Sequence, residues 1–413
     1  MPDKGIVIIG GGHGGSQAAA SLRADGYAGP LTLVTAETEI PYQRPPLSKA
    51  FLKDPAHDLL PLRPESFYAK QAIELRRGVE AVAIDRQDDV VRLADGSTIG
   101  FAGLVLAAGA RPRVPAVGGI DLDGVFYLRH ADDARRLRDR LHGAGDVVVV
   151  GGGFIGLEIA ATARLLGKTV TVLEAADRLM GRAAAPEISR HFLALHRGWG
   201  SDVRLDTPLG RIVGEGGKVV AVETAAGAAI PADIAVVGIG VLPNVELASG
   251  AGLAVDNGIL VDDFMATGDP RILAIGDCVA FHHWALGRRV RLESVQNAVD
   301  QGKTAAATLV GKREPYRAVP WFWSDQGDIK LQMVGLPTDA TNSVLRGRPD
   351  SGSFSVFHFA GAKLVAIDSV NRPTDHMVGR RMIAAGTSPA PAVVADESTD
   401  LKALIGMAAP AGE

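Results

Sequence analysis

The chain has 413 residues, of which 47% are hydrophobic and 22% charged, and its formal net charge at pH 7 is −4. This composition predicts a soluble globular protein of about three domains, with no overall attraction to nucleic acid or to an anionic membrane. We expect no membrane span, no signal peptide ahead of a first strand at Ile6, and a cytoplasmic location. The single cysteine, Cys278, excludes an intrachain disulfide and a C-x-x-C redox pair.

The N-terminal part carries a dinucleotide-binding pattern. Its parts come in the order strand, glycine loop, helix, strand and acid, namely residues 6–9, then Gly10, Gly12 and Gly15, then 16–24, 31–35 and Glu37. Glycines in this spacing allow a tight turn, after which the N-terminus of the helix presents backbone N–H groups to a pyrophosphate. The pattern therefore predicts a Rossmann-like fold.

A proline-rich segment follows at 41–49. Its paired prolines fix φ, and we expect them to forbid a helix before Leu47. A rigid loop at the carboxyl end of a parallel sheet lies where ligands bind, although a purely structural turn fits as well. Short strands are expected at 78–85 and 90–93. An apolar strand over 103–108 ends at glycine and proline, which suits a domain exit.

The same pattern recurs in the middle of the chain, in a stronger form. Four valines at 147–150 precede Gly151, Gly153 and Gly156, and a helix over 157–166, a strand over 169–173 and Glu174 follow. Glu174 would accept hydrogen bonds from an adenosine ribose and would repel a 2′-phosphate, which favours NADH over NADPH. Two dinucleotide folds imply two dinucleotides, and FAD with a nicotinamide dinucleotide is the expected pair.

The rest of the chain predicts a return to the first fold and then a separate unit. A connecting helix is expected at 131–141, buried strands at 235–244 and 272–277, and a helix at 295–310 whose positive N-terminus would suit the edge of a flavin. The C-terminal unit should hold strands at 330–334, 355–359 and 364–368 and a helix at 374–385, with a loose tail from Ala408.

The predicted fold class is thus α/β, with two Rossmann-like domains, the second inserted in the first, and a C-terminal α+β domain. The expected boundaries are 1–110 and 236–318 for the FAD-binding domain, 111–235 for the NADH-binding domain, and 319–413 for the C-terminal domain.

Six motifs in this order resemble those of the FAD-dependent NADH:ferredoxin reductases of bacterial oxygenase systems, the putidaredoxin-reductase-like members of the glutathione-reductase-like flavoproteins. They are 41–49 (PYQRPPLSK), 151–158 (GGGFIGLE), 240–244 (GVLPN), 276–278 (GDC), 293–298 (ESVQNA) and 321–326 (WFWSDQ). The resemblance covers nearly the whole chain.

The resemblance implies an FAD site. Its residues would be Gly12, His13, Gly14 and Gly15 at the pyrophosphate, Glu37 or its neighbour Ala36 at the ribose, Val82 at the adenine, Arg129 near the domain crossing, Asp277 at a ribityl or phosphate oxygen, and Val295 at the flavin O2 edge. Arg44, Pro46, Gly276, Glu293 and Ser294 are counted with them. Trp321 and Trp323 would reach the flavin side, whereas Phe322 is expected in the core.

The resemblance also implies an NADH site with two catalytic residues. The nicotinamide dinucleotide would be bound and oriented by Gly151, Gly152, Gly153, Ile155, Gly156, Glu158, Glu174 and Gly240. Lys49 would approach the isoalloxazine and pair with Glu158, bridging the two folds. The flavin performs the chemistry once NADH is held against it, so no acid–base dyad is required, and no metal site is expected.

With one cysteine, the electrons must leave the protein, and an acidic [2Fe–2S] ferredoxin fits as the acceptor. Basic residues are candidates for steering it: Arg63, Arg288, Arg289, Arg291, Arg313, Arg317, Arg380 and Arg381. An NADH oxidase or peroxidase is the first alternative, but the loop in which those enzymes commonly carry a cysteine holds Leu47, Ser48 and Lys49 here. An apoptosis-inducing-factor-like NADH-responsive protein, a monodehydroascorbate reductase and a rubredoxin reductase remain open.

Overall fold

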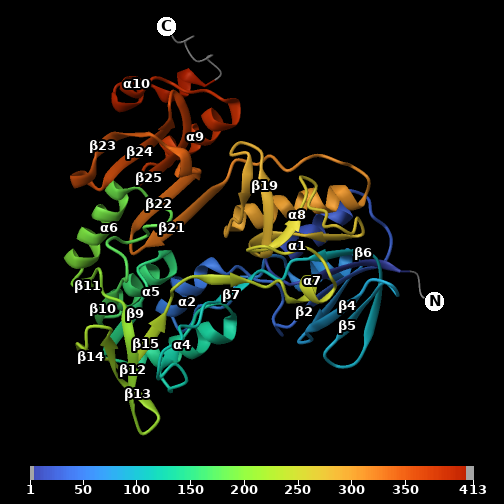
Figure 1. Cartoon of the computed structure of the whole chain (residues 1–413), viewed down its shortest axis with the longest axis horizontal. Helices are drawn as coiled ribbons and strands as arrows, with labels where there is room; N and C mark the ends of the chain where they lie inside the picture. The colour runs from blue at the N-terminus through green and yellow to red at the C-terminus, as the bar shows by residue number, and fades with distance from the viewer. Residues whose placement is uncertain (1–3, 406–413) are drawn as a thin grey trace. The chain divides into compact units, whose positions relative to one another are not determined.

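In the computed structural model, which describes residues 4–405, the chain divides into two units (Figure 1). The first contains residues 4–44, 58–111 and 241–318, and the second contains residues 45–57, 112–240 and 319–405. Each unit is therefore assembled from three separate stretches of the chain.

The first unit is built on a seven-stranded sheet of order β3-β2-β1-β6-β5-β4, in which β18 also pairs with β6. Its strands are β1 (Gly5–Ile9), β2 (Leu31–Thr35), β3 (Ile73–Arg77), β4 (Ala81–Asp85), β5 (Val90–Leu93), β6 (Thr98–Leu106) and β18 (Ile272–Ala274). β18 runs parallel to β6 and sets Ile272 opposite Leu104. The predicted return of the chain to its first fold is thereby confirmed.

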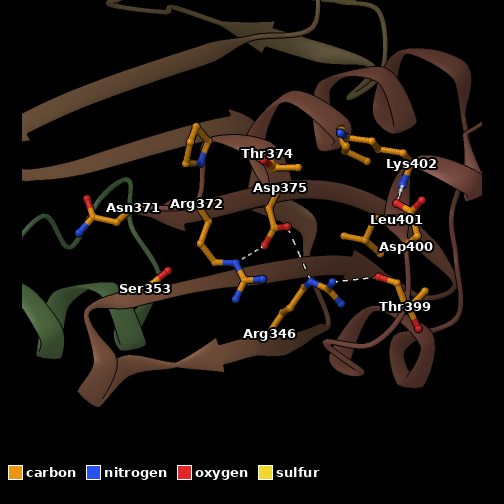
Figure 2. Close-up of a pocket in the computed structure, with 12 residues that line it drawn as sticks. Arg346, Ser353, Asn371, Arg372, Thr374, Asp375, Thr399, Asp400, Leu401 and Lys402 are labelled. Carbon is orange, nitrogen blue, oxygen red and sulfur yellow. Dashed lines mark hydrogen bonds and ion pairs between the residues drawn. The ribbon is translucent and has the colours of Figure 1, made fainter.

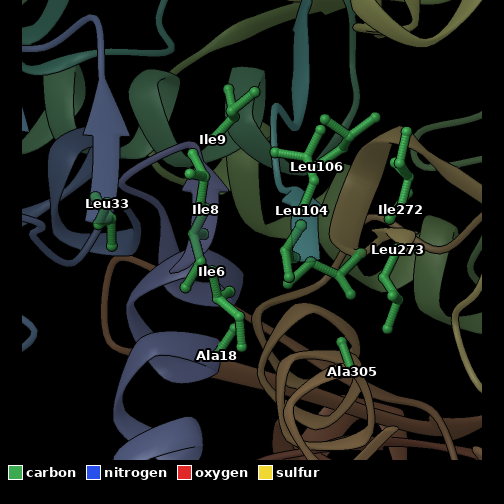
Figure 3. Close-up of a cluster of buried hydrophobic side chains, with 14 of the residues drawn as sticks. Ile6, Ile8, Ile9, Ala18, Leu33, Leu104, Leu106, Ile272, Leu273 and Ala305 are labelled. Carbon is green, nitrogen blue, oxygen red and sulfur yellow. The ribbon is translucent and has the colours of Figure 1, made fainter. Parts of the chain in front are cut away.

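Two helices cover this sheet, α1 (His13–Ala24) and α8 (Val295–Leu309). Figure 3 shows Ile6 and Ile8 of β1 and Leu104 of β6 above Ala18 of α1 and Ala305 of α8, and all five side chains are buried. Alanines at these positions let helix backbones approach the sheet closely. The core therefore holds α1, which begins at His13 within the glycine loop, against the sheet.

The remaining elements of the first unit are short. They are α3 (Glu65–Lys70), α7 (Glu246–Gly250), η2 (Gly276–Cys278) and the strands β16 (Val241–Pro243), β17 (Ile259–Val261), β19 (Val279–His283) and β20 (Arg288–Val290). β17, β19 and β20 form a three-stranded sheet. β16 pairs with β7 (Ala110–Pro112), which ends the second stretch of this unit.

The second unit contains a parallel sheet of order β11-β10-β9-β15-β8. Its strands are β8 (Val125–Phe126), β9 (Asp146–Val150), β10 (Thr169–Leu173), β11 (Asp202–Arg204) and β15 (Ile234–Val237). The helices around it are η1 (Pro45–Ser48), α2 (Ala50–Lys53), α4 (Ala131–Gly143), α5 (Phe154–Leu165) and α6 (Pro186–Gly198). A three-stranded sheet is added by β12 (Leu209–Glu215), β13 (Lys218–Thr224) and β14 (Ala229–Pro231).

The C-terminal part of this unit is an antiparallel sheet of order β21-β22-β25-β24-β23. Its elements are β21 (Trp321–Gln326), β22 (Ile329–Gly335), η3 (Pro337–Asp339), β23 (Asn342–Arg348), η4 (Pro349–Ser351), β24 (Ser353–Ala360), β25 (Lys363–Val370), α9 (Pro373–Ala385), α10 (Pro391–Ala395) and η5 (Leu401–Leu404). One face packs on α6, where Ile188 and Phe192 share a core with Leu331 and Phe354.

Most expected elements are present, but several corrections are needed. The strand expected from Ala235 ends at Val237, and α6 and the sheet of β12, β13 and β14 were not predicted. The C-terminal sheet has five strands rather than three, because β21 and β23 were not predicted. β3 was also missed, and the strand expected at 78–85 begins only at Ala81. The expectation of no helix before Leu47 was wrong, because η1 starts at Pro45; the first turn of a helix needs no N–H from proline, and the φ of proline suits it. The tail from Ala408 lies outside the described residues.

Candidate functional site

The glycine loop of the first unit leaves room for a phosphate group at one position. Gly10 has φ +116°, and a Cβ there would lie 2.2 Å from the carbonyl oxygen of Ala107. A Cβ on Gly15 would lie 1.9 Å from the oxygen of Gly10. Around Gly12, by contrast, no atom of the described chain comes within 4 Å of such a Cβ. Space held open beside the N-terminus of α1 fits the approach of a pyrophosphate.

The second unit repeats this geometry. Gly151 has φ +109°, with the oxygen of Gly238 at 2.4 Å from an added Cβ, and a Cβ on Gly156 would lie 2.2 Å from the oxygen of Gly151. Gly153, the counterpart of Gly12, again has open space, with nothing from residues 4–405 within 4 Å. The residues present thus fit one dinucleotide in each unit.

An acid stands at the end of the second strand in both folds. The Glu174 carboxylate accepts a hydrogen bond from the Gly152 N–H at 2.7 Å and another from the Ala176 N–H at 2.8 Å. Glu37 pairs with Arg44 at 2.5 Å and accepts a hydrogen bond from the Tyr42 hydroxyl. Backbone donors fix Glu174 beside its glycine loop, which is where a ribose would lie.

Glu158 is the centre of a buried polar cluster in the second unit. It lies on α5 and is 5% exposed. Lys49 Nζ lies 2.7 Å from Oε2, and the Ser48 hydroxyl donates to the same oxygen at 2.5 Å. The Ser324 hydroxyl donates to Oε1 at 2.7 Å. The expected pairing of Lys49 with Glu158 is confirmed, whereas the part played by Ser48 and Ser324 was not predicted.

The N-terminus of α8 has the form expected of an anion-facing helix end. The helix starts at Val295, and the Ser294 hydroxyl caps it by accepting a hydrogen bond from the Asn297 N–H at 3.1 Å. Just before it, Glu293 pairs with Arg291 at 2.7 Å. The N–H of Val295 stands in the first turn, where helix N–H groups lack intrahelical acceptors.

The predicted site residues divide between the units. The first unit holds Gly12, His13, Gly14, Gly15, Glu37, Arg44, Val82, Gly276, Asp277, Glu293, Ser294 and Val295. The second holds Pro46, Lys49, Arg129, Gly151, Gly152, Gly153, Ile155, Gly156, Glu158, Glu174, Gly240 and Trp323. Val82 and Ile155 are exposed apolar residues, at 51% and 44%. Single exposed apolar side chains are common on protein surfaces, so their exposure alone does not test the predicted contacts.

The aromatic residues of β21 take different roles. The rings of Trp321 and Trp323 lie 5.5 Å apart. Phe322 packs against Phe154 at 4.6 Å between ring centroids and joins the core around α5, as expected. Ser324 and Gln326 follow, spaced by two, so both point to the same side of the strand. This alternation is the signal that could have identified them from the sequence.

Cys278 has no features of a redox thiol. It is fully buried, and burial raises the pKa of its thiol to about 11. A reactive cysteine needs a lowered pKa and access to solvent. Among residues 4–405 there is also no group of three or more histidine, cysteine or acidic side chains that could hold a metal ion. No helix in that range is long and apolar enough to cross a membrane.

A hollow of about 440 Å³ lies in the C-terminal part of the second unit (Figure 2). Arg346 and Arg372 both extend toward Asp375 there, and Arg372 Nε lies 2.7 Å from its carboxylate. Arg346 donates to the carbonyl oxygens of Asp396 and Thr399 at 2.6 and 3.0 Å. These bonds tie residues 396–399 to the C-terminal sheet.

Comparison with known proteins identifies the family. Residues 4–302 match the family model described as "Pyridine nucleotide-disulphide oxidoreductase", and residues 321–405 match "Reductase C-terminal". The chain belongs to the pyridine nucleotide-disulphide oxidoreductases. The protein is accordingly an oxidoreductase that uses FAD and a nicotinamide dinucleotide, as predicted. Despite the name of the family, its single cysteine leaves no disulfide within the chain.

Similar proteins of this family align over nearly the whole chain. Rhodocoxin reductase of Rhodococcus erythropolis is 48% identical over 401 residues, covering 97% of this chain and 94% of the relative. Putidaredoxin reductase CamA of Pseudomonas putida is 42% identical, covering 98% and 97%. The ferredoxin reductase for the CYP199A2 system from Rhodopseudomonas palustris superposes with a TM-score of 0.95 at 46% identity, over 98% of this chain and all of that chain.

A second solved structure is that of a covalent complex between putidaredoxin reductase and putidaredoxin. It matches with a TM-score of 0.94 at 42% identity, over 98% of this chain and 99% of that chain. The glutathione-reductase-like fold and the C-terminal α+β domain predicted from the sequence are both confirmed by these matches.

Proposed function

We propose that this protein oxidises NADH and delivers the electrons, through FAD, to an acidic [2Fe–2S] ferredoxin that serves a cytochrome P450 or another oxygenase. The observation that carries the proposal is the alignment of almost the entire chain with rhodocoxin and putidaredoxin reductases. The two glycine loops with open space at Gly12 and Gly153 agree with it, because they fit two dinucleotides. The single, buried cysteine agrees as well, because the chain has no dithiol that could accept electrons from the flavin.

Each glycine loop has its own task in this proposal. FAD, when bound, can accept a hydride and release electrons one at a time. The loop at Gly12 and the N-terminus of α8 at Val295 would hold its pyrophosphate and its flavin edge. The loop at Gly153 would hold NADH, with Glu174 at the adenosine ribose. The Glu174 carboxylate beside that loop would repel the 2′-phosphate of NADPH.

Lys49 and Glu158 would act beside the reacting rings. Hydride transfer does not require either residue to move a proton. Their proposed role is to provide a fixed ion pair beside the rings and to keep the rings in position. The same proposal includes the remaining residues expected at the cofactors, among them Arg44, Pro46, Val82, Arg129, Gly240 and Trp323. A cytoplasmic location also remains a prediction.

We propose that two arginines of the steering set contribute most to docking of an acidic partner. Arg288 and Arg289 are exposed on β20, whereas Arg291 is largely buried by its ion pair with Glu293. Arg313 and Arg380 lie over the rings of Phe264 and Trp321. We therefore test the docking contribution first on Arg288 and Arg289, two exposed arginines that are adjacent on one strand.

Rubredoxin is a second candidate acceptor. The rubredoxin–NAD(+) reductase of Pseudomonas putida is 40% identical over 369 residues, covering 89% of this chain and 96% of that protein. The discriminating assay is steady-state NADH oxidation with cytochrome c as the final reporter, run with a [2Fe–2S] ferredoxin, with rubredoxin, or with neither. We expect turnover with the ferredoxin to exceed the other two. Equal turnover in its absence would favour an oxidase, and slow flavin reduction throughout would favour an NADH-responsive binding protein.

A further inference from the structure

A line of buried polar side chains leads from Glu158 into the interior of the second unit. Ser324 donates to Glu158 Oε1 at 2.7 Å, and the Gln326 amide donates to the Ser324 hydroxyl at 3.3 Å. Nε2 of His196 lies 2.8 Å from Gln326 Oε1. Ser324, Gln326 and His196 are all fully buried. Buried polar groups destabilise a core unless they are hydrogen-bonded. A continuous line of them is therefore expected to serve a function other than stability.

The bonds in this line all run in one direction. The amide oxygen of Gln326 can only accept, so His196 must donate through Nε2–H. Gln326 then donates to Ser324, and Ser324 donates to Glu158. Burial lowers the pKa of the His196 imidazole, which keeps the ring neutral at neutral pH. Because an amide does not take up and release protons in this range, the line cannot carry a proton and can only hold position.

The far end of the line is anchored by packing. The His196 ring, on α6, lies edge-on to Trp199, the residue that caps the C-terminus of this helix, with 5.0 Å between ring centroids. Ser324 and Gln326 are fixed in β21, which pairs with β22 through Ser324 opposite Leu331. Two rigid elements therefore set the position of the donor that reaches Glu158.

We propose that Ser324, Gln326 and His196 are positioning residues that hold the Glu158 carboxylate, and through it the Lys49 ammonium, in the arrangement required for hydride transfer from NADH to FAD. The inference rests on the proposed function. Within it, Ser324 fixes one carboxylate oxygen, while Ser48 and Lys49 share the other. Without Ser324, the carboxylate can turn about its last side-chain torsion, which has a broad energy minimum.

The test uses the FAD-loaded protein with Ser324→Ala and a matched control, Ser355→Ala. Ser355 is also a fully buried serine of the C-terminal sheet, and it donates to Asp375 at 2.9 Å rather than to Glu158. Both variants lose a buried hydrogen bond to a carboxylate and should lower the unfolding temperature to a similar degree. Only Ser324→Ala should alter the visible circular dichroism of the oxidised flavin before NADH is added.

Anaerobic stopped-flow reduction by NADH then separates position from stability. We expect Ser324→Ala to lower the limiting rate constant about ten-fold, the effect of one hydrogen bond to a charged group. The NADH dissociation constant should stay unchanged, and Ser355→Ala should reduce at the wild-type rate. A Ser324→Ala protein that reduces like wild type, or a control slowed equally, overturns the inference. A wild-type protein that NADH does not reduce refutes the proposed function instead.

A double-mutant cycle tests whether the line acts as one unit. Gln326→Leu should slow reduction in the wild-type background and have no further effect in Ser324→Ala, because the link to Glu158 is already cut. Additive effects of the two substitutions would show that Gln326 acts independently of Ser324, and would overturn the extension of the line to Gln326 and His196.

Discussion

Replacing Glu174 with glutamine should convert a protein selective for NADH into one that also accepts NADPH. The substitution keeps the size of the side chain and one acceptor for the N–H groups that now fix it, those of Gly152 and Ala176 at 2.7 and 2.8 Å. It removes the negative charge and, with it, one of the two accepting oxygens, since the Gly152 N–H donates to Oε2 and the Ala176 N–H to Oε1. The change therefore tests the charge at a nearly constant side-chain size.

The size of the effect follows from the position of the carboxylate. Glu174 is half-buried beside its loop, so an effective dielectric constant of about 20 applies. A 2′-phosphate about 6 Å away would meet a repulsion of about 3 kcal/mol per unit charge, before screening by salt. This corresponds to a discrimination of about 100-fold in favour of NADH, most of which Glu174→Gln should abolish.

The assay is kcat/KM for NADH and for NADPH with ferricyanide as acceptor, which makes the result independent of any ferredoxin. Glu37→Gln is the matched control, because Glu37 follows β2 (Leu31–Thr35), the equivalent strand of the other fold. We expect the control to leave the NADH:NADPH ratio unchanged. A ratio unaffected by Glu174→Gln, or one that shifts in Glu37→Gln, would show that the two folds have been assigned to the wrong dinucleotides.

Three further outcomes are expected. Gly12→Ala should fold normally, because its Cβ meets open space, but should lose FAD on gel filtration. Gly153→Ala should keep FAD and raise KM for NADH. Full retention of both ligands would contradict the assignment of a dinucleotide to each glycine loop. Burial lowers the pKa of the His283 imidazole to about 4, so the unfolded chain takes up this proton at a higher pH than the folded chain. The free energy of unfolding should therefore be unaffected above about pH 6.5 and about 2 kcal/mol lower at pH 5. The melting temperature of His283→Gln should depend less on pH over this range. Arg288→Glu combined with Arg289→Glu should raise KM for ferredoxin and leave ferricyanide reduction alone, and ferredoxin kinetics unchanged across a salt series would count against this docking surface.

The parts of the fold that the sequence predicts are those specified locally. The valines of β9 and the glycines after them require a buried strand and a tight turn whatever surrounds them, and the structure has both. The return strand β18 was recognisable for the same reason, since an apolar run of this kind fits only a buried position in a sheet.

The parts that could not be predicted depend on contacts distant in the sequence. β21 mixes tryptophans with polar residues and lacks the apolar run of a buried strand, because Ser324 bonds to a carboxylate on α5 and Gln326 to a histidine on α6. His196 and Gln326 are 130 positions apart, and no local pattern indicates that they meet. The pairing of Lys49 with Glu158 was expected only because the surrounding motifs resemble a known family.

The most direct test of the whole account is to reduce the purified protein with NADH in the absence of oxygen and then add an oxidised [2Fe–2S] ferredoxin. The account predicts a yellow protein that bleaches with about one equivalent of NADH, ignores NADPH, and regains its colour as the ferredoxin is reduced. A protein that cannot be loaded with FAD, or a reduced flavin that keeps its electrons in the presence of the ferredoxin, would contradict it.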